Sequence, residues 1–78
     1  MERFVEHDGD VYDARHGGPF DRGSADSYYG RPRRPHYFEG SSYSSQEIIP
    51  QRTDVAYWEY LMGYEHNEQR GSHKDWGE

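Results

Sequence analysis

Apolar positions recur with a helical period in the second half of this 78-residue chain. Between residues 54 and 67, aromatic and aliphatic side chains return every three or four positions, which places them on one face of a helix. The stripe consists of Tyr57, Tyr60, Leu61 and Tyr64, with Trp58 and Met62 widening it on either side. Thr53 or Asp54 is the expected N-cap. The pattern predicts a helix from about Asp54 to Asn67 whose apolar face packs in the core.

A second helical pattern covers residues 19–29. Pro19 suits a first helical turn, and Asp21 places a negative charge where the helix dipole favours one. Gly30 can adopt the left-handed conformation that ends many helices. We therefore predict a helix from Pro19 to Tyr29. The side chains on one of its faces are Phe20, Gly23, Ser24, Ser27 and Tyr28.

Each predicted helix carries a glycine on its packed face. Glycine is about 1 kcal/mol less favourable than alanine inside a helix, so Gly23 needs a compensating interaction, such as the close approach of another backbone. Gly63 opens a matching gap in the aromatic face of the later helix. We predict that the two helices cross near Gly23 and Gly63.

Turn residues punctuate the rest of the chain. Asp8-Gly9 separates two short apolar pairs, which is typical of a tight hairpin turn. A two-stranded ribbon is marginal by itself, so this arm is expected to be either flexible or docked on the rest. Prolines and serines in residues 31–46 predict an extended loop. Residues 47–50 are interpreted as a short strand or an apolar anchor.

The expected fold class is mainly α, in three parts. Residues 1–18 form an acidic arm or short hairpin, and residues 19–70 form a small two-helix domain with a long Pro- and Ser-rich connecting loop. Residues 71–78 form a polar tail, whose Lys74-Asp75-Trp76 end can fold back on the domain.

Composition predicts a thin aromatic core. Val, Ile, Leu and Phe are few, and with a net charge of −6 the chain has the composition of many disordered proteins. Eight tyrosines and two tryptophans offset this shortage, because each ring buries roughly 150–250 Å². The chain has no cysteine, so neither a disulfide nor a thiolate zinc site stabilises the core.

No apolar run approaches the roughly 18 residues of a membrane span. The first six residues also lack the apolar segment of a secretory signal. The sequence therefore predicts a cytoplasmic protein without membrane contact.

The expected binding surface is a basic and aromatic segment together with the acidic arm. The basic segment, residues 31–36, contains three guanidinium groups and an imidazole, and Pro32 and Pro35 stiffen its backbone. This combination suits contact with carboxylates or phosphates. Aromatic rings beside arginines also form platforms for single-stranded bases. The arginines are expected to pair with the protein's own N-terminal arm or with an acidic patch on a partner. The expected binding residues are Tyr28, Tyr29, Arg31, Arg33, Arg34, His36, Tyr37, Asp8, Asp10 and Asp13.

No motif indicates catalysis, a cofactor or a metal. The run from Asp8 fails the calcium-loop pattern because its sixth position is Asp13 instead of glycine and its twelfth is Pro19 instead of glutamate. The five histidines lack a short paired spacing and are interpreted as solvated. The serines lack the context of a nucleophile elbow. We expect a protein that is not an enzyme and that holds no cofactor.

The sequence also resembles two protein families. Arg22-Gly23 and Gly30-Arg31, followed by Tyr60-Leu61-Met62-Gly63-Tyr64, resemble the ribosome modulation factor family, which implies a packed helix pair. A looser pattern over residues 17–77 is similar to small uncharacterised proteins of tailed bacteriophages. It comprises Gly17-Gly18, Arg-Gly-x-x-Asp-x-Tyr-Tyr-Gly-Arg, Pro35-His36, Gly63-Tyr64, Asn67-Glu68 and Lys74-Asp75-Trp76.

The expected function is therefore binding. One hypothesis is a phage-type accessory protein that docks on a host protein or protein complex in the host cytoplasm and modulates or inhibits it; surface carboxylates can occupy a basic groove meant for phosphates. The alternative is a ribosome- or RNA-associated modulator, although a charge of −6 disfavours phosphate contact outside the basic segment. A virion component is a third possibility. The sequence leaves the oligomeric state open.

Overall fold

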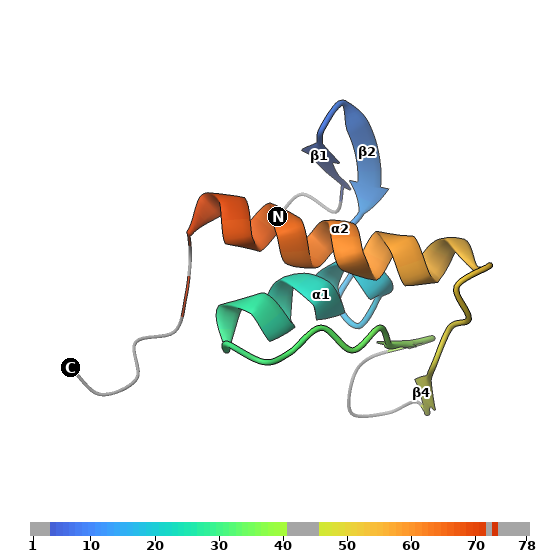
Figure 1. The fold of residues 1–78 in the computed structure, drawn as a ribbon. Coiled ribbons are helices and arrows are strands. Elements are labelled where there is room, and N and C mark those ends of the chain that lie inside the picture. Colours follow the sequence, from blue (N-terminus) through green and yellow to red (C-terminus); the bar gives the residue numbers. More distant parts are fainter. Residues whose placement is uncertain (1–3, 41–45, 72, 74–78) are drawn as a thin grey trace.

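The computed structural model describes residues 4–40, 46–71 and 73 (Figure 1). The predicted folding back of Lys74-Asp75-Trp76 lies outside these residues. Along the chain the elements are β1 (Phe4–His7), β2 (Asp10–Asp13), α1 (Pro19–Tyr28), β3 (Tyr37–Phe38), β4 (Glu47–Ile48) and α2 (Val55–Arg70).

The two helices meet at their glycines, as predicted. A Cβ atom on Gly23 would overlap the carbonyl oxygen of Tyr60 and would lie 2.8 Å from the backbone nitrogen of Tyr64. A Cβ atom on Gly63 would lie 2.8 Å from the carbonyl carbon of Phe20. Only glycine allows backbones to approach this closely. In Figure 1, α1 accordingly lies directly against α2.

The core between the helices is aromatic at its centre and polar towards one end. Phe20 and Tyr60 are buried, with exposed fractions of 2% and 0%. Ser27 and Asn67 are also buried, and the Asn67 side-chain amide donates a hydrogen bond to Ser27 Oγ at 2.9 Å. Ser27 Oγ in turn donates to Glu68. Polar pairing thus replaces aliphatic packing at this end of the interface.

The predicted apolar stripe of α2 is wrong at one edge. Trp58 is 48% exposed, and its indole N–H donates to the Arg52 carbonyl at 2.8 Å. The buried face consists of Tyr60, Gly63, Tyr64 and Asn67. The physical reason is that α1 approaches α2 most closely at Gly63. The buried face of α2 is therefore centred on Gly63, and Trp58 lies outside it.

Glycines end both helices. Gly30 has φ 72°, and the amides of Gly30 and Arg31 donate to the carbonyls of Ser27 and Asp26 at 3.0 and 2.8 Å. These two bonds form a Schellman motif. At the end of α2, Gly71 adopts φ 69°, so that helix continues to Arg70 and not only to the predicted Asn67.

The N-terminal arm is a docked hairpin, which is one of the two expected alternatives. Asp8 and Gly9 both have positive φ, at 51° and 85°, as a tight two-residue turn requires. On its inner face, the Tyr12 ring stacks on Phe20 with centroids 5.2 Å apart. The His7 ring meets the His66 ring edge to face, also at 5.2 Å. The hairpin is therefore attached to both helices.

The two expected helices are present, but a second antiparallel strand pair shows that the fold is not purely helical. β3 and β4 pair Tyr37 with Ile48 and Phe38 with Glu47, and the Phe38 amide also donates to the Gly17 carbonyl at 2.7 Å. The two ends of the connecting loop are extended, so they can satisfy each other's backbone groups. The described part of the chain thus contains two helices and two small antiparallel strand pairs.

Within the part of the chain that the structure describes, no helix combines the length and hydropathy needed to cross a membrane.

Candidate functional site

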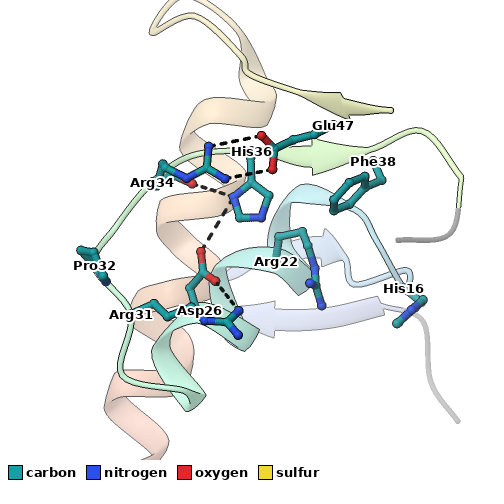
Figure 2. Close-up of a pocket in the computed structure, with 9 residues that line it drawn as sticks. All are labelled: His16, Arg22, Asp26, Arg31, Pro32, Arg34, His36, Phe38 and Glu47. Carbon is teal, nitrogen blue, oxygen red and sulfur yellow. Dashed lines mark hydrogen bonds and ion pairs between the residues drawn. The ribbon is translucent and has the colours of Figure 1, made fainter. Parts of the chain in front are cut away.

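An open pocket of about 500 Å³ lies beside the segment that follows α1 (Figure 2). Its lining is rich in cationic side chains, with two carboxylates between them. The lining residues are His16, Arg22, Asp26, Arg31, Pro32, Arg34, His36, Phe38 and Glu47.

A buried carboxylate on α1 organises the pocket wall. Asp26 is 4% exposed, accepts a hydrogen bond from the Tyr60 hydroxyl, and lies 3.4 Å from Arg31 Nη1 and 3.8 Å from His36 Nδ1. Burial, and then the bond to Asp26, raise the pKa of the Tyr60 phenol far above its usual value. The phenol therefore remains a donor at any physiological pH. The Arg34 amide donates to the same hydroxyl at 3.1 Å, so the network joins α1, α2 and the basic segment.

Arg34, an exposed arginine of the pocket, has an internal partner. Arg34 makes a two-pronged contact with Glu47, with N···O distances of 3.3 and 2.9 Å. The hydrogen bonds to Glu47 raise the pKa of Arg34, and those from Arg34 lower the pKa of Glu47. Figure 2 shows this pair at the pocket edge.

The other arginines of the segment lie over tyrosine rings. The Arg31 guanidinium is 4.8 Å from the Tyr29 ring centre, and the Arg33 guanidinium is 4.4 Å from that of Tyr64. The expected pairing of the arginines with the N-terminal arm is not what the structure shows, because the carboxylates come from α1 and β4. The physical reason is proximity in the fold, since the segment follows α1 directly and leads into β3, which pairs with β4, and this places Asp26 and Glu47 next to Arg31 and Arg34. Much of the segment's positive charge is thus compensated internally.

The outer face of the hairpin combines apolar and acidic side chains. The cross-strand pairs Phe4 with Asp13 and Glu6 with Val11 lie on this face. Phe4 is 59% exposed and Val11 is 67% exposed. Residues 4–13 contain four carboxylates and neither lysine nor arginine. The two apolar side chains, Phe4 and Val11, are therefore exposed on a hairpin that is otherwise negatively charged.

Carboxylates of α2 extend this negative region. The pKa of Tyr12 is raised by burial and then by Asp10, Asp8 and the α2 residues Glu59 and Glu65. The pKa of Glu59 is itself raised, first by burial and then by Asp13. After burial, each of these two pKa shifts therefore includes a contribution from carboxylates of the other element.

The raised pKa of Glu59 predicts a stabilising substitution. The unfolded carboxyl titrates near its ordinary value of 4.5 and the folded one titrates above it, so stability falls as the pH rises through that window. We expect Glu59→Gln to raise the melting temperature at pH 7 and to leave it unchanged at pH 4. Thermal unfolding at both pH values tests this. An equal effect at both would mean that the charge of Glu59 is not responsible.

The predicted binding residues lie in two separate groups. The hairpin with Asp8, Asp10 and Asp13 stands on one side of α2 (Figure 1). Residues 31–38 follow α1 instead, and their first part lies against the Tyr60 and Tyr64 side chains of α2. Tyr28 and Tyr29 are 37% and 38% exposed at the end of α1. The structure does not combine the two groups into one surface.

The interpretation of the histidines as solvated is wrong for two of them. His7 and His36 are buried, with exposed fractions of 3% and 7%. The spacing of the histidines along the sequence does not indicate their burial. The alternation of side chains along β1 does indicate it for His7, because His7 shares the inner face with Val5 and not with the exposed Phe4 and Glu6.

No family model, curated protein or solved structure gives a significant match to this chain.

Proposed function

We propose that this protein is a small non-catalytic binding protein that docks on a basic surface of a host protein or protein complex and modulates or inhibits it. The observation that carries the proposal is the outer face of the hairpin, where exposed Phe4 and Val11 lie among carboxylates in a ten-residue stretch without lysine or arginine. The resemblance to tailed-phage proteins adds a phage-encoded accessory protein acting in the host cytoplasm.

The chemistry of this face fits a protein partner. Exposed apolar side chains supply the contact that excludes water, and a charged rim selects the partner and speeds its approach. Phe4 and Val11 are suited to the first role, and Glu6 and Asp13 to the second. A partner with lysines or arginines around an apolar depression would complement both.

The basic segment supports RNA binding less well. Asp26 and Glu47 already compensate Arg31 and Arg34, and the whole chain carries −6. Contact with phosphates would require these internal pairs to open against an unfavourable overall field. The RNA-associated alternative is therefore kept as an outcome of the test.

The test compares matched pairs of exposed substitutions. The target is first captured from a bacterial lysate with the full-length protein and identified, and its affinity is then measured with purified components. We expect Glu6→Lys to weaken binding at least tenfold, about 1.4 kcal/mol, whereas Glu39→Lys makes the same charge change outside the hairpin and has little effect. Likewise Val11→Thr should weaken binding, and Val55→Thr should not.

The RNA alternative has its own signature. If Arg33→Glu and Arg34→Glu abolish co-sedimentation with ribosomes or RNA while Glu6→Lys leaves it intact, the docking proposal fails. Circular dichroism of each variant verifies that the helices are retained.

A further inference from the structure

One buried polar atom on the inner face of the hairpin lacks a hydrogen-bond partner. Among the described residues that are not exposed, His7 Nε2 is the only buried side-chain nitrogen or oxygen in this condition. The His7 side chain is 2% exposed. A buried polar atom without a partner is destabilising, so its presence calls for a ligand or another specific reason.

Two carboxylates face this nitrogen. Asp8 Oδ2 lies 3.4 Å from His7 Nε2, and Glu65 Oε1 lies 3.6 Å from it. All three atoms lie within 4.8 Å of one another. Ligand atoms about 2.0–2.1 Å from a tetrahedral zinc ion are about 3.3 Å apart, so both distances from His7 are close to those of a zinc site.

We propose that His7, Asp8 and Glu65 bind a divalent transition-metal ion, for which Zn²⁺ is the best fit. An imidazole nitrogen selects zinc and its neighbours over Mg²⁺ and Ca²⁺, which prefer oxygen ligands throughout. Two carboxylates balance the charge of the ion. The Asp8 and Glu65 side chains are 63% and 43% exposed, so the ion can enter from solvent. The fourth coordination position of the ion is then open to water.

The surroundings of His7 orient it for this role. Its other ring nitrogen, Nδ1, lies 3.2 Å from Nδ1 of His66 on α2. Histidine ligands commonly donate their second ring N–H to a neighbour, which fixes the tautomer and the ring orientation. With the proton on Nδ1 and His66 as acceptor, the lone pair of Nε2 points at the two carboxylates. That arrangement is repulsive without a cation and favourable with one.

The site would join the hairpin to α2. Asp8 occupies the hairpin turn with φ 51°, Glu65 lies on α2, and the chain has no cysteine for a disulfide. A bound ion therefore stabilises the docked position of the hairpin, as metals do in other small domains. This proposal does not depend on the proposed partner, because its test needs none.

The first measurement uses the untagged full-length protein after chelator treatment. Adding ZnCl₂ is expected to raise the melting temperature and to show saturable binding of one ion per chain by calorimetry, whereas MgCl₂ and CaCl₂ produce no comparable effect. Co²⁺ should give the visible absorption of a tetrahedral site. The competing explanation is a protonated His7 that forms ion pairs with Asp8 and Glu65. Absence of saturable zinc binding would support that explanation and overturn the proposal.

Conservative variants then locate the ion. Asp8→Asn keeps a residue that tolerates positive φ, and Glu65→Gln keeps the helix, so both are expected to fold. Each should lower zinc affinity at least tenfold. Asp10→Asn removes the same charge from the same hairpin, and His16→Gln removes an exposed imidazole; both should bind zinc like the wild type. If Asp8→Asn and Glu65→Gln bind zinc as tightly as these two controls, the site is elsewhere and the proposal fails.

Discussion

Replacing Gly63 with alanine is expected to destabilise the folded state by about 3 kcal/mol or more, measured as the free energy of unfolding in urea. The added Cβ would lie against the backbone of Phe20 in α1, 2.8 Å from its carbonyl carbon. Backbone cannot rotate away as a side chain can, so the helices must separate. Because small domains have only about 5–15 kcal/mol of stability, this is a large fraction of the total.

Whether Gly63→Ala lowers or raises the free energy of unfolding distinguishes an effect of helix packing from one of helix propensity. Alanine is about 1 kcal/mol better than glycine within an exposed helix, so a glycine without a backbone neighbour would give a more stable variant. Ser24→Ala in α1, next to Gly23, is a matched control and should leave stability nearly unchanged. A Gly63→Ala protein as stable as the wild type would mean that the helices do not meet there.

Replacing Tyr60 with phenylalanine is expected to lower the free energy of unfolding by about 2–3 kcal/mol. The hydroxyl of Tyr60 donates to Asp26 and accepts from the Arg34 amide. Its removal leaves a buried carboxylate and a backbone donor without these partners. The loss of a hydrogen bond to a buried charge exceeds the small gain in apolarity.

A matched substitution separates this network from a general effect of tyrosine. Tyr57→Phe removes a hydroxyl from a half-buried residue on the same helix and should change stability by less than about 0.5 kcal/mol. The double variant Tyr60→Phe with Asp26→Asn should lose less than the sum of the two single losses, because both act on one interaction. Additive losses would show that Tyr60 and Asp26 do not act together.

The proposed docking surface and the proposed metal site both involve the hairpin, but they lie on opposite faces of it. Its outer face presents Phe4 and Val11 to solvent, and its inner face places His7 against α2. A metal ion on the inner side would hold the outer side in position without touching a partner. Zinc dependence of target affinity would then appear as a secondary effect of hairpin docking.

Local signals were sufficient for much of the fold. Asp8-Gly9 predicted the hairpin turn because few residues adopt positive φ at two successive positions. Pro19 and Gly30 predicted the limits of α1 for similar local reasons. The crossing at Gly23 and Gly63 was also predictable, because a glycine on the packed face of a helix is unfavourable unless another backbone approaches it.

Other features depended on neighbours distant in sequence. Trp58 was predicted to pack because it is large and apolar, yet its position relative to Gly63 directs it to solvent. Ser27 was predicted on the packed face of its helix, but no sequence signal indicated its partner or the burial of Asn67; the two side chains are hydrogen-bonded to each other between the helices. The strand pairing of Tyr37 with Ile48 likewise requires both ends of the loop to return to the same place.

The conformational preferences of single residues were sufficient to predict where the chain turns, which segments are helical and that the helices meet at two glycines. The partners of the charged and titratable groups, in contrast, became known from the three-dimensional arrangement alone. It placed Asp26 against Tyr60, Glu47 against Arg34, and His7 between Asp8 and Glu65. The reason is that such partnerships are set by distances of a few ångströms between elements, which neither charge nor spacing along the chain can specify.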